Sequence, residues 1–75
     1  MYTIVEIKQQ GPMVRVRTNP PGGATVSGKL VKHKKSGFVV LHNSHYKVYD
    51  AACHLVADIS AAQWPMKKSA YSSYC

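Results

Sequence analysis

Short apolar stretches alternate with turn-forming residues through the middle of the chain. Residues 14–17 read Val-Arg-Val-Arg, so a strand here places both valines on one face and both arginines on the other. Residues 24–31 form a second β-prone stretch, interrupted by Gly28, where a strand can bend sharply. Three more strands are predicted, at residues 38–41, 46–49 and 54–59. Five strands with connections of about two to six residues predict an antiparallel all-β domain.

The apolar run from Phe38 to Leu41 limits the possible arrangements of the predicted strands. It contains no polar position, which is typical of a strand that is buried on both faces. A single flat sheet would leave one face of this strand in water, whereas a bend at Gly28 folds the sheet onto itself. We therefore expect a small, strongly bent, SH3-like barrel over residues 13–60.

The two ends of the chain have weaker patterns. Residues 1–12 are expected to form an N-terminal extension, as a short helix or an extra strand. Residues 61–75 are expected to form a basic and aromatic tail, with a short helix possible near Trp64 and a mobile stretch over residues 66–75. The alternative for the tail is contact with nucleic acid or a neighbouring subunit, through Trp64, Tyr71 and Tyr74 among Lys67 and Lys68.

The length and composition indicate that the domain needs a further source of stability and that its net charge favours a polyanionic partner. With 75 residues the chain has room for one domain, and 45% hydrophobic residues exclude a disordered chain. A domain this small buries only about 60% of its unfolded surface, so self-assembly, disulfides or metal must support it. Ten Lys and Arg residues against three Asp and Glu residues give a net charge of +7. This charge favours a polyanionic partner.

Disulfide, metal and cofactor chemistry are not expected. Cys53 and Cys75 form no CxxC motif and are interpreted as free thiols of a reducing compartment. His42 and His45 are the only close pair of histidines, two ligands short of a zinc site. No apolar run approaches 18 residues, so a cytoplasmic location is expected. Self-assembly remains the favoured source of stability.

An enzymatic function is also not expected. The three acidic side chains, Glu6, Asp50 and Asp58, are not paired at a spacing that suits general acid–base catalysis. The chain has no Ser-His-Asp or Cys-His pattern and no Gly-rich loop that would cradle a phosphate.

Two segments resemble the motifs of the Sm, LSm and Hfq family. Residues 26–30 (Val-Ser-Gly-Lys-Leu) and, after a loop, residues 38–43 (Phe-Val-Val-Leu-His-Asn) are similar to the first Sm motif. Residues 46–56 are similar to the second motif in its Hfq-type form, and residues 14–17 take the place of the first strand. The resemblance implies a bent five-stranded sheet in a closed ring of five to eight identical subunits that binds single-stranded RNA. Small single-domain relatives from phages and microbes have chains this short.

The resemblance also implies a subunit interface. In the family, the fourth strand of one subunit pairs with the fifth strand of the next subunit. The corresponding interface residues here are Tyr46, Val48, Tyr49, Leu55 and Val56. Ring closure would cover strand edges that are otherwise open to aggregation, which supports the same prediction on physical grounds.

The expected RNA-binding residues are basic or aromatic. They are Lys32, His33, Lys34 and Lys35 in one loop, Arg15 and Arg17 on the first strand, and Phe38, which stands where the Hfq pattern has a base-stacking aromatic residue. Asp50-Ala51 replaces the Lys-His pair of Hfq, so the family's sequence-specific reading of RNA is not carried over. We expect a ring that binds single-stranded RNA mainly through charge. The alternative is a structural or protein-interaction ring, or a small β-barrel adaptor without RNA binding.

Overall fold

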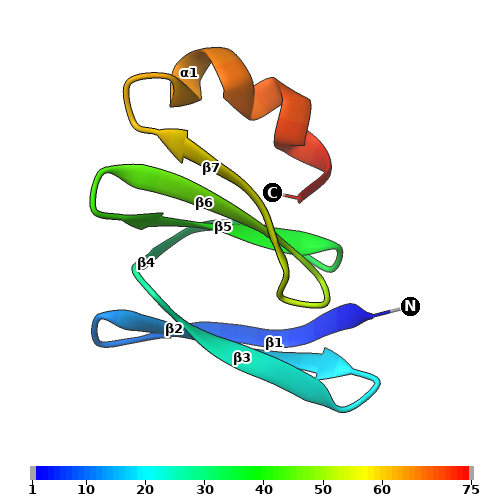
Figure 1. Cartoon of the computed structure of the whole chain (residues 1–75). Helices are drawn as coiled ribbons and strands as arrows, with labels where there is room; N and C mark the ends of the chain where they lie inside the picture. Colours follow the sequence, from blue (N-terminus) through cyan, green and yellow to red (C-terminus); the bar gives the residue numbers. More distant parts are fainter. Residues whose placement is uncertain (1, 75) are drawn as a thin grey trace.

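The computed structural model describes the backbone of residues 2–74 and the side chains of residues 2–71 (Figure 1). Within this range the chain forms seven strands followed by two short helical segments. The strands are β1 (Thr3–Gln10), β2 (Met13–Asn19), β3 (Gly22–Ser27), β4 (Lys29–Lys34), β5 (Gly37–His42), β6 (His45–Asp50) and β7 (Leu55–Ser60). The helical segments are α1 (Trp64–Lys67) and the 3-10 helix η1 (Lys68–Tyr74).

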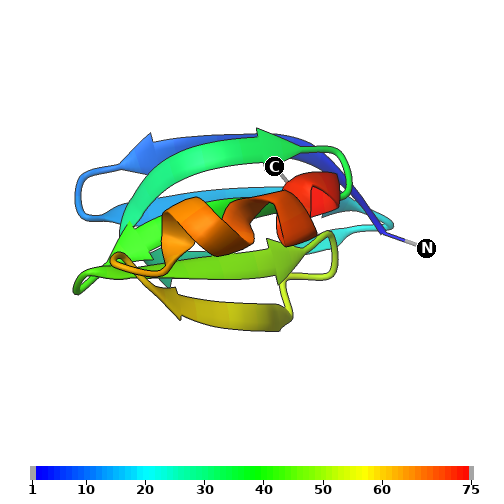
Figure 2. The same ribbon diagram turned by 90° about the horizontal axis from the view of Figure 1, so that it is seen from above.

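The strands form two antiparallel sheets, with strand orders β1-β2-β3 and β4-β5-β6-β7. Figures 1 and 2 show the three-stranded sheet, the four-stranded sheet and the C-terminal helical segments as successive layers. The all-β class is thus confirmed, and each of the five predicted strands is present. The N-terminal extension is a sixth strand, β1, and the stretch from Ala24 to Val31 is divided at Gly28 between β3 and β4.

The expectation of a closed barrel needs correction. Over residues 2–74, β3 pairs only with β2, and β7 pairs only with β6, so each keeps one unpaired edge. The bend at Gly28 does turn the chain from one sheet into the other, but the sheets meet as layers and do not close on that side.

The strand β2 shows why the two sheets pack together. Val14, Val16 and Thr18 are buried, whereas the residues between them are exposed. The two valines form a core between the sheets with Phe38 and Val40 of β5. The alternating pattern of the sequence therefore predicts correctly which face of β2 is inside.

The strand β5 is buried on both faces, as its apolar sequence predicts. Phe38 and Val40 pack in the core between the sheets, and Val39 packs on the opposite side with Val48 and Trp64. The Trp64 ring is 8% exposed and stacks on Tyr46, with ring centroids 4.6 Å apart and planes 13° apart. The short helix expected near Trp64 is present, and the segment that follows is not a free tail as far as Tyr71, which also packs against this cluster on the outer face of the four-stranded sheet.

This helical cover is short. Pro65 stands in the first turn of α1, where its missing N–H costs no hydrogen bond. Among residues 2–74 there is no helix with the length and apolar character needed to span a membrane.

A tight corner at Gly28 connects the two sheets. The φ angle of Gly28 is +127°, and a Cβ atom here would lie 2.9 Å from the carbonyl oxygen of Leu41. The Gln9 side chain fixes the corner from outside: its Nε2 donates to the carbonyl oxygens of Gly28, Met13 and Gly11, and its Oε1 accepts from the N–H of Leu30 at 2.7 Å. Glycine is required at this point because the backbone of β5 passes so close.

The edge strands β1 and β4 lie side by side and are joined at both ends. At one end the N–H of Ile4 donates to the carbonyl oxygen of Lys35, at 3.0 Å. At the other end the Gln9 side chain holds Leu30. Between these two links, the described backbone has no hydrogen bond from β1 to β4. We call this region, between Ile4–Ile7 and His33–Lys35, the seam.

The subunit contact implied by the family resemblance does not fit this topology. The strand β6, which holds Tyr46, Val48 and Tyr49, pairs with β5 on one side and with β7 on the other. Both of its edges are therefore occupied within the chain. A ring that used the β6 edge would first require β7 to separate from it.

Candidate nucleic-acid interface

The basic loop predicted from the sequence is mostly a basic strand. Lys32, His33 and Lys34 belong to β4, and Lys35 lies in the turn that follows. All four residues are exposed. Because β4 is an edge strand, its outer side carries this charge along the seam rather than at the tip of a flexible loop.

The second basic group lies on the outer face of the three-stranded sheet. Arg15 and Arg17 are exposed there because Val14 and Val16 occupy the buried face. Lys8 of β1 stands directly opposite Arg15 and adds a third cation, whereas Glu6 stands opposite Arg17. Directly opposed residues of antiparallel strands share one face, so these four side chains lie together.

These two groups, together with Lys29, form a basic region on the β1–β4 side of the molecule, which extends from the face with Arg15 and Arg17 to the face of β4 where Lys32 stands opposite Val39. We call it the basic belt; its residues are Lys8, Arg15, Arg17, Lys29, Lys32, Lys34 and Lys35, all exposed. It holds seven of the ten Lys and Arg residues of the chain. Of the three acidic side chains, Asp58 lies on β7, the opposite edge of the four-stranded sheet, whereas Asp50 of β6 stands opposite Gly37 beside the turn that holds Lys35. The cations are thus gathered on one side of the molecule, whereas the acidic side chains are not confined to the other.

A groove of about 480 Å³ runs along the seam inside this belt. Its lining combines aliphatic, basic and acidic side chains: Ile4, Val5, Glu6 and Ile7 come from β1, and His33, Lys34 and Lys35 come from β4 and its turn. Val5 is 54% exposed, so the groove offers apolar surface beside cations. Such a combination suits a ligand with an apolar ring and a negative charge.

Phe38 does not contribute to this surface. Its side chain has no exposed area and stacks on Tyr49, with centroids 4.9 Å apart and planes 12° apart. The interpretation of Phe38 as a base-stacking residue is corrected on this ground, because no base can reach the ring in this fold.

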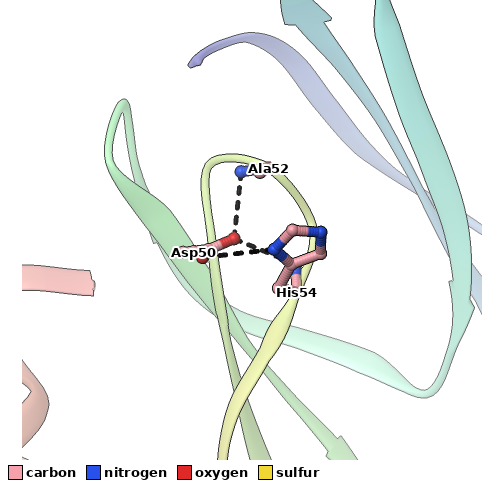
Figure 3. Close-up of polar contacts among 3 residues, drawn as sticks. All are labelled: Asp50, Ala52 and His54. Atoms are coloured by element: carbon pink, nitrogen blue, oxygen red, sulfur yellow. Dashed lines mark hydrogen bonds and ion pairs between the residues drawn. The ribbon is translucent and has the colours of Figure 1, made fainter. Parts of the chain in front are cut away.

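The link between β6 and β7 has a structural role that its sequence did not suggest. Figure 3 shows the Asp50 carboxylate inside this turn, where Oδ1 accepts from the N–H of Ala52 at 3.0 Å and from the N–H of His54 at 2.9 Å. Cys53 adopts a left-handed conformation, with φ of 65°. Asp50 therefore shapes the turn at the position where the Hfq-type pattern has a basic pair.

Two groups beside this turn have shifted acidities. Burial raises the pKa of the Cys53 thiol, and the Asp50 carboxylate raises it further. Burial also raises the pKa of the Tyr49 phenol, with smaller contributions from Asp58 and Cys53. Both shifts favour the neutral form, so neither group is prepared as a nucleophile. The second thiol, Cys75, lies outside the described residues.

The histidines do not gather into a metal site. The Nδ1 atom of His45 lies 2.9 Å from Oδ1 of Asp58, and His42 contacts the Asn43 amide at 3.3 Å. Across the described part of the chain, no group of three His, Cys, Asp or Glu side chains could hold a metal ion.

The residues predicted for a subunit interface have separate environments. Val48 is fully buried, and Tyr46 and Tyr49 are half-buried in aromatic stacks. Leu55 and Val56 are 53% and 41% exposed, on the strand β7 with its free edge. These two are the most exposed of the five residues.

The sequence does not predict Lys8 and Lys29 of the basic belt or the aliphatic lining of the groove. Lys8 joins the arginines only because β1 pairs with β2, whereas the sequence of residues 1–12 allows a helix as well as a strand. The aliphatic lining from Ile4 to Ile7 was missed for the same reason. The pattern Ile-Val-Glu-Ile-Lys could have suggested a strand, but nothing in the sequence indicates that it lies beside β4.

Comparison with protein-family models, with curated proteins and with solved structures found no match to this chain.

Proposed function

We propose that this protein binds single-stranded RNA, with the basic belt on the phosphates and the seam groove on a base. The observation that supports this most is the gathering of seven exposed cations on β1, β2, β4 and the turn after β4, two of which, Lys34 and Lys35, line the groove. Phosphate contacts supply most of the affinity of such surfaces, and each contact releases counterions from the nucleic acid. The expected binding is therefore strong at low salt and weak at high salt.

The shape of the groove favours a single strand over a duplex. The two walls of the groove are joined at one end by the hydrogen bond from the N–H of Ile4 to the carbonyl oxygen of Lys35. A single strand can turn an unstacked base into such a groove, whereas the bases of an A-form duplex are stacked inside it. Contact with the exposed Val5 and the half-buried Ile7 would remove the base from water.

A salt titration with matched charge reversals tests this proposal. We expect the Lys32→Glu/Lys35→Glu variant to lose about 10–100-fold in affinity for a single-stranded RNA of mixed sequence at ~50 mM salt. The slope of log affinity against log salt should become shallower by about 0.7 for each phosphate contact that is lost. Fluorescence anisotropy of a labelled oligonucleotide measures both quantities.

The matched control is Lys67→Glu/Lys68→Glu, because it makes the same change of charge in α1 and η1, outside the basic belt. If both double variants lose affinity equally, the binding depends on net charge and not on the belt. If no single-stranded RNA binds at ~50 mM salt, the proposal is wrong.

The free edge of β7 favours a second function, contact between copies of this chain. Its Leu55 and Val56 are exposed, and within residues 2–74 no strand pairs with β7 on the side away from β6. A bulge at the start of β7 and the charge of Asp58 protect the edge in part, so we propose a weak association.

Light scattering should show a mass that rises with concentration, and Leu55→Lys should abolish this rise. Val5→Lys is the control, at 54% exposure on the other side of the molecule. A constant monomer mass in the unmodified chain would exclude the association.

A further inference from the structure

The seam groove contains one acidic side chain in an otherwise basic surface. Glu6 lines the groove with Ile4, Val5 and Ile7, opposite His33, Lys34 and Lys35. A carboxylate opposes the binding of phosphates, so a surface that only collected RNA by charge would gain from its removal. The position of Glu6 therefore points to a contact with a different part of the ligand.

The Glu6 carboxylate keeps its capacity to accept hydrogen bonds. Its Oε1 atom lies 3.9 Å from Nε of Arg17, which is longer than a hydrogen bond. The side chains of Glu6 and Arg17 are 50% and 63% exposed, so their ion pair is also screened by water. A ligand in the groove thus meets carboxylate oxygens that are oriented loosely and are not saturated.

Different parts of the groove suit the phosphate and the base of a nucleotide. Lys34 and Lys35 lie at the end of β4 and in its turn, where a phosphate would be attracted. The isoleucine side chains and Val5 form the apolar part, on which the base would lie. Glu6 lines the groove from the sheet face that also carries Arg17, so it would meet the polar edge of a base that lies on the exposed Val5 beside it.

We infer that Glu6 is a specificity-determining residue, which selects bases that present amino groups and disfavours uracil. This inference rests on the proposed binding of single-stranded RNA. A carboxylate only accepts hydrogen bonds, and cytosine and adenine each present an exocyclic amino group that donates them. The Watson–Crick edge of uracil has one carbonyl oxygen on each side of its N–H, and these two oxygens repel the carboxylate. Recognition at this edge is the usual way in which proteins read single-stranded RNA.

The test compares homopolymers of about 12 nucleotides, a length within the usual site size for single-strand binding. With anisotropy at ~50 mM salt, oligo-C and oligo-A should bind about tenfold more tightly than oligo-U, which is the effect of one charge-assisted hydrogen bond. The Glu6→Gln variant should reduce this ratio to less than about twofold, because a carboxamide both donates and accepts and can pair with uracil as well as cytosine. Asp58→Asn is the matched control: it removes one negative charge at the opposite edge of the sheet and should leave the ratio unchanged.

A second measurement locates the base independently of affinity. The chain has three isoleucines, of which Ile4 and Ile7 line the groove and Ile59 packs with Trp64 on the far side of the four-stranded sheet. Ring currents from a base bound to oligo-C should shift the methyl resonances of Ile4 and Ile7, and those of Ile59 should stay in place.

The outcomes separate the two proposals. If all homopolymers bind but oligo-U binds as tightly as oligo-C, the role of Glu6 is wrong, and RNA binding by the basic belt stands. Unchanged Ile4 and Ile7 resonances in a saturated complex also overturn the placement of the base. If no homopolymer binds, both proposals fail together.

Discussion

The two sheets of this protein differ in what covers their outer faces. The outer face of the three-stranded sheet is in water and carries Lys8, Arg15 and Arg17. The outer face of the four-stranded sheet is covered by α1 and η1, and Val39 and Val48 beneath them are fully buried. The two sheets therefore serve different purposes. The three-stranded sheet has a charged, solvent-exposed outer face that is available for binding. The four-stranded sheet is covered on both faces and supplies apolar burial that a small domain otherwise lacks.

The largest expected effect is removal of the cover from the four-stranded sheet. Trp64→Ala should lower the free energy of unfolding by about 3–5 kcal/mol, because it deletes a buried aromatic side chain and its stack on Tyr46. Urea denaturation measures this loss. Met66→Ala in the same helix is the control, since Met66 is 78% exposed and should cost at most about 0.5 kcal/mol. Equal losses from the two variants would show that the helical segment does not stabilise the sheet.

This contrast between the sheets also explains which parts of the fold could be predicted from the sequence. The alternation in β2 and the uninterrupted apolar run in β5 predict burial on one face and on two faces, because such patterns follow from local geometry. The sequence did not predict what covers the second face of β5. A segment with one tryptophan among Lys67, Ser69 and Ala70 has the composition of a tail, and only its tertiary contacts make it part of the core.

The candidate site was predicted in part for a similar reason. Lys32 to Lys35 and the two arginines are exposed as expected, because a polar position on a strand faces water. The seam itself depends on the pairing of residues 3–10 with β2 and on their proximity to β4, which lies more than 20 residues away in the chain. Phe38 was misassigned because an aromatic residue at the start of an apolar strand suits a core as well as a binding surface.

The next largest effect should come from the joint between the two sheets. Gln9→Ala removes the acceptor of the Leu30 N–H and the donor to three carbonyl oxygens at exposed positions, so it should cost about 0.5–1.5 kcal/mol of unfolding free energy. Gln10→Ala is the neighbouring control, because the Gln10 side chain is exposed on the three-stranded sheet. Hydrogen exchange should accelerate at Leu30 in Gln9→Ala and remain slow at Val16. No acceleration at Leu30 would show that Gln9 does not fix the corner.

A small effect on stability, with a larger effect on binding, is expected from the wet face. Arg15→Ala/Arg17→Ala should change the free energy of unfolding by less than about 0.5 kcal/mol, because both side chains are exposed and the ion pair of Arg17 with Glu6 is long. The same variant should lower RNA affinity by a factor of about 5–50 at low salt. A loss of stability comparable to that of Trp64→Ala would contradict the distinction between the two outer faces.

The smallest expected effect lies between the sheets, at the phenol of Tyr49. Burial raises the pKa of this group above its ordinary value of 10.0, and the negative charges of Asp58 and Cys53 act in the same direction. The unfolded chain therefore loses this proton at lower pH than the folded chain, so the contribution to stability is complete below pH 10.0 and decreases as the pH rises further. Tyr49→Phe removes the phenol and should make the fall in stability above this pH shallower. Tyr2→Phe, which removes a phenol that is 47% exposed, is the control and should leave the slope of the unmodified chain unchanged. If Tyr49→Phe keeps that slope as well, water reaches the phenol freely, and the core between the sheets is more open than the stack of Phe38 on Tyr49 implies.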